Sequence, residues 1–290
     1  MPVDLIAAEQ FLLANARLLD RHRMAVLLHG APSAPVLQTL AAYRNDDGGF
    51  GHALEPDVRA PDSEPTSTLH ALHVLAEMSA LEDPMSKGAA IWIAGIADTD
   101  GGVPFVMPTA AAYPRAPWMV PTDGGSQLTF AFAALVQQAD PDDAWLARAS
   151  EWCWSRLEAP EPPSGYLVKF ALEFLDAAAD DTRAHLAIER LRAQLDHDGS
   201  IEVPGGTENE RLTALTLSPD PEARSRALFS DEQIEADLDR LERLQRDDGG
   251  WDFDWLAWSE GQSVEWRGAV TLATLQTLHA NRRLSLTQSG

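Results

Sequence analysis

The stretch Asp46-Asp47-Gly48-Gly49-Phe50 returns in altered form three times along the 290-residue chain. The later copies are Asp98-Thr99-Asp100-Gly101-Gly102-Val103, Asp196-His197-Asp198-Gly199-Ser200-Ile201 and Asp247-Asp248-Gly249-Gly250-Trp251. The copies lie about fifty residues apart, with one double gap, and a turn that recurs at a fixed period indicates one repeated supersecondary unit. Helical periodicity precedes and follows each copy, so we predict helical hairpins in which the turn glycine stops the first helix.

Apolar spacing predicts most of the chain to be helical. The predicted helical ranges are 3–29 (one long or two short helices), 35–43, 66–81, 84–97, 123–135, 142–157, 165–179, 182–195, a segment from about 209, 231–246 and 264–279. A long loop is expected over 104–121, a degenerate turn over 158–164, an excursion over 218–229 and a polar tail over 284–290. We therefore expect residues 1–290 to form one all-α domain, an α/α toroid of about six hairpins around a central cavity. The alternative is an open superhelix, whose terminal repeats would need polar caps.

Composition excludes several classes of protein. The formal charge of −23 argues against nucleic acid or an anionic membrane surface as a partner. Cys153 is the only cysteine, which excludes a disulfide framework and a cysteine-based zinc site. The start of the chain lacks a signal segment, and no apolar run approaches the length that spans a bilayer. We expect a cytoplasmic protein with no integral membrane segment, and the sequence leaves the oligomeric state open.

The last copy carries a family resemblance. Gln245-Arg-Asp-Asp-Gly249-Gly-Trp251 fits the Gln-x-x-x-Gly-x-Trp core (the QW motif) found in the terpenoid cyclase and prenyltransferase superfamily, and Arg44 to Phe50 has the same register. The chain therefore resembles the α/α toroids of that superfamily, which implies the fold but not the reaction. The zinc-binding prenyltransferase branch and the magnesium-binding Asp-Asp-x-x-Asp branch have no good counterpart in this sequence.

The class II cyclases use the middle acid of Asp-x-Asp-Asp-Thr to protonate an alkene. The stretch Asp62-Ser63-Glu64-Pro65-Thr66 looks like a departed form of that motif. The resemblance implies that Glu64 is the acid, whereas Pro65 replaces a carboxyl group that would orient it. Asp62 and His52 are the residues that we expect to tune the acid.

Carboxylates recur where the inner helices are expected to begin. They are Glu64, Asp123, Glu208 or Glu210, and Glu265. Gathered at one mouth, they would raise at least one pKa into the range useful for a general acid. The alternative is that each acid caps its helix or favours the positive end of the helix dipole.

Other residues are candidates for binding. The polar cluster His52, Glu55, Asp57 and Arg59 follows the first turn, where loops on a rigid scaffold often bind ligands, although local pairing in a solvated loop fits equally. His70 and His73 share a helix face, as packed histidines or as a metal pair without a third ligand. The loop aromatics could stabilise a carbocation or stack on sugars, and the anion contacts would be arginines. The aromatics are Phe105, Tyr113, Trp118, Phe253, Trp255, Trp258 and Trp266, with Trp251 expected to be structural; the arginines are Arg59, Arg115, Arg211 and Arg267.

Three functions remain open at this level. The first is an acid-catalysed, class II type transformation of an isoprenoid or similar apolar small molecule. Its catalytic residues would be Glu64, Asp62 and His52; its substrate-binding residues would be Glu55, Asp57, Arg59, Trp118, Asp123, Trp255, Trp258, Glu265 and Arg267. No metal or cofactor is expected, except Mg²⁺ if the substrate is a diphosphate. The second is a carbohydrate-active toroid with paired acids and stacked tryptophans. The third is a toroid that binds a ligand or peptide without catalysis.

Overall fold

A computed structural model describes residues 3–159 and 165–285 of the chain. Within them the protein is almost entirely helical, with one two-stranded sheet. None of the helices in this part of the chain is long and apolar enough to cross a membrane. The described residues fall into two compact units. Unit 1 lies within 1–39 and 195–290, and unit 2 lies within 40–194.

Unit 1 is built around the long helix α12. Its elements are α1 (Leu5–Asn15), α2 (Leu18–His29), most of α3 (Ala34–Ala41), β1 (Ile201–Glu202), β2 (Arg211–Leu212), α10 (Ala214–Leu217), the 3₁₀ helix η3 (Arg224–Leu228), α11 (Asp231–Arg243) and α12 (Glu260–Ala280). The two strands are antiparallel, and Ile201 pairs with Leu212. α1 and α2 pack on α12 around a core that includes Phe11, Trp251 and Leu272. The predicted N-terminal segment is therefore two helices.

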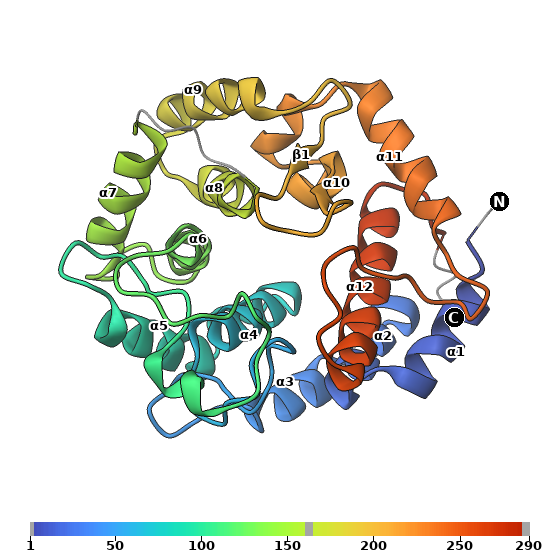
Figure 1. Ribbon diagram of the computed structural model, residues 1–290, viewed down its shortest axis with the longest axis horizontal. Helices are drawn as coiled ribbons and strands as arrows, with labels where there is room; N and C mark the ends of the chain where they lie inside the picture. Colours follow the sequence, from blue (N-terminus) through green and yellow to red (C-terminus); the bar gives the residue numbers. More distant parts are fainter. Residues whose placement is uncertain (1–2, 160–164, 286–290) are drawn as a thin grey trace. The chain divides into compact units, whose positions relative to one another are not determined.

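Unit 2 has two layers of helices. Its elements are α4 (Pro65–Glu77), α5 (Pro84–Ile96), η1 (Pro108–Ala112), α6 (Leu128–Ala139), α7 (Leu146–Leu157), α8 (Tyr166–Ala177), α9 (Asp181–Leu191) and η2 (Arg192–Gln194). α4, α6 and α8 form one layer, and α5, α7 and α9 cover it as the second (Figure 1). Every residue of α6 from Leu128 to Val136 is buried, so this helix is the core of the unit.

The four predicted turns share one hydrogen-bond pattern. In the first, the amide of Asn45 donates to the carbonyl of Gly49 at 2.9 Å, and the amide of Gly48 donates back to Asn45 at 3.0 Å. The carboxylate of Asp47 accepts the amide of Gly49 at 3.0 Å. The same three bonds recur in the copies centred on Asp100, Asp198 and Asp248. The turn glycine has a positive φ in each copy, which explains why glycine recurs there.

Three of the turns are tied to a later helix by a threonine. The amide after the first turn, at Phe50, donates to the hydroxyl of Thr68 on α4 at 3.0 Å. The amides of Val103 and Trp251 make the equivalent bonds to Thr129 on α6 and Thr271 on α12. All three threonines are buried. Each of these three turns is therefore held against the helix that follows it, near the start of α4 and α6 and at the middle of α12.

Three details of the sequence prediction are wrong. The turn glycines do not stop their helices: α3 ends at Ala41, well before Gly48, and the glycine belongs to a separate turn. The helix expected from Asp123 begins only at Leu128, because residues 123–126 form a loop in which Gly124 has a positive φ. The helix expected from about 209 is replaced by the β1–β2 hairpin and the single turn of α10, since Ser218 and Pro219 end helical structure there. The degenerate turn at 158–164 lies largely outside the described residues.

Gly249 offers a test of the repeat turn. It has a φ of +90°, and a Cβ there would lie 2.2 Å from the carbonyl oxygen of Ala7 in the same unit. We expect Gly249→Ala to lower the free energy of unfolding by about 3 kcal/mol, from backbone strain and overpacking together. Gly205→Ala is the control, because Gly205 has a φ of +79° and open space around it. It should cost about 1 kcal/mol from strain alone. Equal losses in urea unfolding would contradict the packing role of the turn.

Candidate active site

Glu64 is a fully buried acid at the first position before helix α4. Its amide donates to the carbonyl of Phe50 at 2.8 Å, and its own carbonyl accepts the amide of Thr68 at 2.9 Å. The side chain does not cap the helix, and it has no exposed surface. The alternative that Glu64 is a helix-capping residue is therefore wrong for its side chain. The backbone of the acid is held by the first repeat turn and by α4.

The two carboxyl oxygens of Glu64 have different surroundings. Oε2 accepts the amide of Met107 at 3.0 Å. Oε1 is buried and has no hydrogen-bond partner among the described residues. The neighbouring hydroxyl of Thr66, in the first turn of α4, is also buried without a partner in that part of the chain. A buried polar atom without a partner is costly, and such atoms in native structures often mark a functional site.

Burial raises the pKa of Glu64 into the neutral range. Desolvation raises the pKa of Glu64 to about 7, while hydrogen bonds from the Met107 amide and the Thr109 side chain lower it and the charge of Asp62 raises it slightly. Since the Met107 amide donates to Oε2, a carbonyl oxygen suits that position, and Oε1 is the oxygen left to carry the proton of the neutral acid. Glu64 therefore presents an acidic hydrogen on the one oxygen that is not engaged by the protein.

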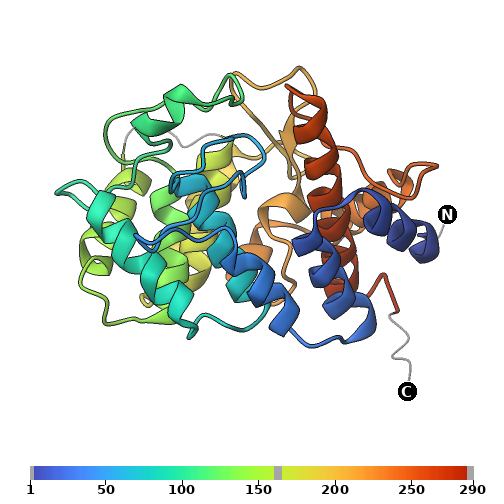
Figure 2. The ribbon, with the colours of Figure 1, turned by 90° about the horizontal axis from the view of Figure 1, so that it is seen from below.

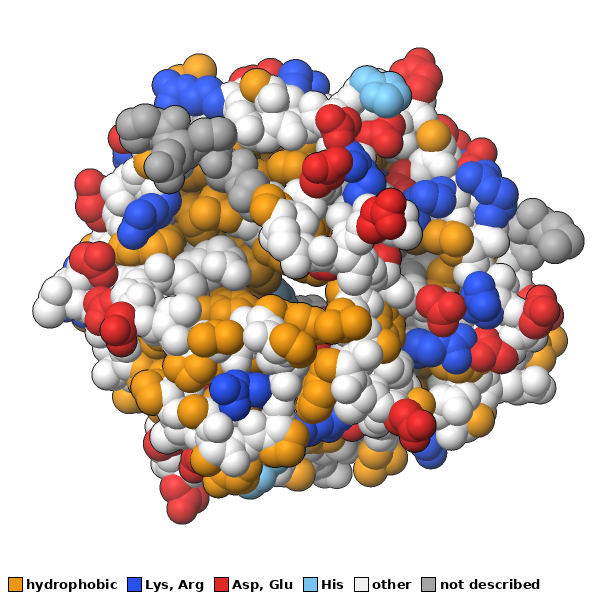
Figure 3. Space-filling model, in the orientation of Figure 1, with side chains coloured by type: hydrophobic (Ala, Val, Ile, Leu, Met, Phe, Trp, Pro, Cys, Tyr) orange, Lys and Arg blue, Asp and Glu red, His pale blue; other side chains and the backbone are white. Residues whose placement is uncertain are grey.

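The loop that carries Met107 is held together by Arg115. The guanidinium of Arg115 donates to the carbonyl oxygens of Met119 at 2.8 Å, Ala111 at 3.1 Å and Tyr113 at 3.3 Å. Figure 2 shows this loop, with η1, at the same end of unit 2 as the start of α4. The face in Figure 3 shows mainly apolar side chains over this part of the unit. Arg115, expected as an anion contact, instead shapes the loop.

The polar cluster after the first turn supports the same loop. The amide of Arg59 donates to the carbonyl of Pro114 at 3.0 Å, and the carbonyl of Asp57 accepts the amide of Ala116 at 2.8 Å. Glu55 is buried, and its carboxylate lies 3.8 Å from His70. The backbones of Asp57 and Arg59 thus hold the η1 loop that covers Glu64, whereas the side chain of Glu55 lies beside His70 on α4. The predicted cluster of His52, Glu55, Asp57 and Arg59 is not a wholly solvated loop.

Several predicted residues lie on the surface of unit 2. Asp62 is exposed, and it acts on Glu64 through its charge. His52 is exposed and shares a 2.9 Å hydrogen bond with Asn45 of the first turn. Asp123 is exposed in the loop before α6, and Trp118 is partly exposed on the η1 loop. Of the acids expected at helix starts, Glu64 alone immediately precedes a long helix among the described residues.

The remaining predicted residues belong to unit 1. Arg267 pairs with Asp248 at 2.8 Å and Asp252 at 2.6 Å, and its guanidinium lies over the ring of Phe11. It therefore braces the last repeat turn. Trp255 packs edge-on against Trp266 and beside Phe253. Glu265 lies in the second turn of α12 rather than at its start, and Trp258 is half-buried just before that helix.

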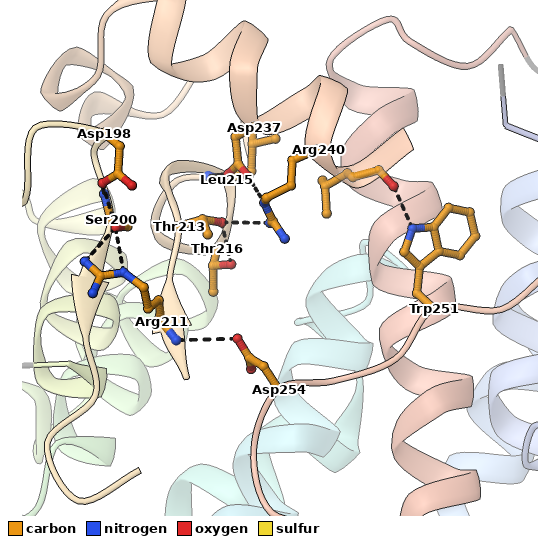
Figure 4. Close-up of polar contacts among 11 residues, drawn as sticks. Asp198, Ser200, Arg211, Thr213, Leu215, Thr216, Asp237, Arg240, Trp251 and Asp254 are labelled. Atoms are coloured by element: carbon orange, nitrogen blue, oxygen red, sulfur yellow. Dashed lines mark hydrogen bonds and ion pairs between the residues drawn. The ribbon is translucent and has the colours of Figure 1, made fainter. Parts of the chain in front are cut away.

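Figure 4 shows how the polar groups of unit 1 are paired. The Arg211 guanidinium bonds to Ser200 of the third repeat turn, and the amide of the same residue donates to Asp254 at 3.4 Å. The guanidinium also pairs with Asp196. Asp237 accepts the amide of Leu215 at 2.8 Å and pairs with Arg240. Trp251 donates its indole hydrogen to the carbonyl of Leu241 at 2.8 Å. The structural role expected for Trp251 is confirmed, whereas Arg211 is engaged by its own unit.

Known proteins supply a comparison of the fold. No family model matches the chain, and no curated protein matches it by sequence. A crystal structure of a protein from Actinoplanes matches with a TM-score of 0.60 and 18% identity, covering 96% of this chain and 99% of that one. The type II terpene cyclase MstE from Scytonema matches with a TM-score of 0.59 and 15% identity in its complex with merosterolic acid A, its product, covering 96% of each chain. MstE with geranylgeranyl dihydroxybenzoate, its substrate, matches with a TM-score of 0.57, 15% identity and the same coverage.

These likenesses establish the fold. The chain has the all-α fold of the α/α-toroid class to which type II terpene cyclases belong, as the sequence predicted. The resemblance to terpenoid cyclases is confirmed at this level. Identities of 15% to 18% carry no residue role across, so the site rests on the geometry around Glu64.

The burial of Glu64 predicts a pH dependence of stability. Its pKa is raised in the folded state, so its stabilising contribution is complete below the ordinary pKa of 4.5 and is lost as the pH rises to about 7. We expect the unfolding free energy of the wild type, relative to Glu64→Gln, to fall by about 3 kcal/mol across that window. Urea unfolding of both proteins through the window provides the measurement. Parallel stability curves would show that the carboxyl group is not buried as a neutral acid.

Proposed function

We propose that this chain is a terpenoid cyclase-like enzyme in which Glu64 protonates an isoprenoid or similar apolar substrate. The observation that carries the proposal is the buried acid whose unengaged oxygen, Oε1, holds the proton. The fold shared with MstE, whose named substrate contains a geranylgeranyl chain, supports the choice of substrate class.

The first step follows from the hydrogen bonds of Glu64. The O–H bond at Oε1 breaks, the π electrons of a substrate alkene form the new C–H bond, and the adjacent carbon becomes a cation. A further alkene of the same substrate can then attack that carbon and close a ring. The carboxylate left on Glu64 keeps the amide hydrogen bond from Met107 and the contact with Thr109, which stabilise its new charge. No metal takes part in this step; Mg²⁺ would matter only for a diphosphate group.

The departures from the class II motif fit this mechanism. Pro65 occupies the first position of α4, where a missing amide hydrogen costs nothing. The orienting role that a neighbouring carboxyl group would have is taken here by Met107 and Thr109 from the η1 loop. Because both groups donate to the acid, they favour its ionised form and ease the loss of the proton.

Replacing the acid tests the proposal. We expect Glu64→Gln to lower turnover of prenylated arenes or squalene by at least about 100-fold, since the general acid is lost. Its melting temperature at neutral pH should stay close to that of the wild type. Wild-type reactions in D₂O should place one deuterium in each product molecule, measured by mass spectrometry.

The matched control is Glu82→Gln, which changes an exposed glutamate of the same unit. This variant should cyclise substrate at the wild-type rate. Turnover by Glu64→Gln at that rate would remove Glu64 as the acid, and product without deuterium would remove alkene protonation itself.

Thr109 provides a second test through the pH profile. Activity requires protonated Glu64, so it should fall as the pH rises through the pKa of the acid, about 7. Thr109→Val removes a contact that lowers this pKa, and the falling limb should therefore move to higher pH. Thr109→Ser retains a hydroxyl and should leave the limb in place. Identical profiles for all three proteins would exclude a hydrogen bond from Thr109 to the acid.

A further inference from the structure

A polar stripe runs along one face of α4, beginning two residues after Glu64. Thr66, His70 and His73 follow one another at spacings of four and three residues, which places them on the same side of the helix. The leucines and the valine of the helix, Leu69, Leu72, Val74 and Leu75, are buried. The stripe therefore combines polar side chains with partial exposure on an element that is otherwise core.

Two carboxylates meet this stripe. Glu173 of α8 is joined to His73 by a hydrogen bond of 2.6 Å between Oε1 and Nε2, and Glu55 lies 3.8 Å from His70. Lys169 stands one turn before Glu173 on α8, and the two attract each other. The described residues contain no group of three or more ligands that could hold a metal, so the two histidines are not the start of a metal site in this part of the chain.

The His73–Glu173 pair fixes the proton on the imidazole. Burial raises the pKa of Glu173, but the charge and hydrogen bond of His73 and the charge of Lys169 lower it further, so the carboxylate is ionised. An ionised carboxylate can only accept, and Nε2 of His73 must donate to it. In the neutral ring the other nitrogen, Nδ1, carries the lone pair and can take a proton, and the resulting imidazolium is the charged form that lowers the pKa of Glu173. A carboxylate that orients an imidazole in this way also stabilises the imidazolium that forms when the base takes a proton.

This inference rests on the proposed function. We propose that His73, oriented by Glu173, is the base that removes a proton from the final cation and so ends the reaction. A cyclisation that begins by adding a proton and yields a neutral alkene must lose one. A C–H bond next to the final cation breaks, its electron pair forms the new C=C bond, and the proton passes to Nδ1 of His73. The imidazolium then releases it to water. Substrate and product differ by no atoms, so no other reactant is needed.

The spacing on α4 suits these two roles. His73 lies nine positions after Glu64, which corresponds to about 13 Å along the helix axis. The acid would act on one end of an elongated substrate and the base near the other. The side chain of His73 is also more exposed than that of His70, at 42% against 14%, and is the more accessible of the two imidazoles.

Product analysis tests the assignment. We expect His73→Ala to consume substrate at close to the wild-type rate, because the protonating step is intact. Its main alkene should fall by about tenfold, with isomeric alkenes and water-captured alcohols in its place, measured by mass spectrometry. Glu173→Gln should shift the products in the same direction. His185→Ala is the control, since His185 forms an exposed histidine–aspartate pair with Asp181 on α9 of the same unit.

Two outcomes would overturn the base assignment. One is an unchanged product spectrum for His73→Ala, and the other is a product shift that appears in His70→Ala instead. Failure of the proposed function looks different, since either the wild type converts no substrate or Glu64→Gln remains active.

An NMR measurement without substrate tests the His73–Glu173 pair itself. In ¹⁵N spectra of the histidines, assigned with His73→Ala, we expect the neutral ring of His73 to carry its hydrogen on Nε2 and none on Nδ1. Glu173→Gln should disturb this tautomer. A neutral ring with its hydrogen on Nδ1 would exclude His73 as the base whatever the substrate is.

Discussion

The hydrogen bond between the amide after a repeat turn and a buried threonine on a later helix is the constraint on which the structure depends. It occurs at Thr68, Thr129 and Thr271, in both units. A buried amide without a partner is expensive, so the turn and its helix must stay in register. The aspartate carboxylate inside each turn satisfies a second amide and keeps the turn rigid. The recurrence of this arrangement explains how weakly similar repeats can build one fold.

The backbone position of the candidate acid, Glu64, depends on the same turn. The Phe50 residue whose amide binds Thr68 also offers its carbonyl to the amide of Glu64. The first turn therefore fixes the backbone just before α4, and the carboxyl group is placed by the same bonds that hold the helix layer. The proposed protonation by Glu64 requires a carboxyl group in a fixed position, and the first repeat turn fixes the backbone that carries it.

The repeat, the all-α class and most helices could be predicted from the sequence, because glycine turns and apolar spacing are local signals. The acidic motif also indicated Glu64. The partners of Glu64 could not be predicted, because Met107 contributes a backbone amide and Thr109 lies in a loop more than forty residues away. The threonines were missed since their bonds span 18 to 26 residues and no local pattern marks them. The partners of Arg267 and Arg115 within the chain could not be predicted, because arginine has the same appearance in a sequence whether it meets a ligand, a carboxylate or a carbonyl group.

The contact between Met107 and Oε2 of Glu64 links the charge of the acid to the position of the η1 loop. The acid holds its proton near neutral pH because the surrounding protein excludes water from it. Wherever the loop moved aside, water would reach the carboxyl group, its pKa would return toward 4.5, and the proton would leave to solvent. Protonation of Glu64 and exclusion of water by the η1 loop would then occur together. In the proposed mechanism, a molecule whose loop has moved aside could not protonate its substrate.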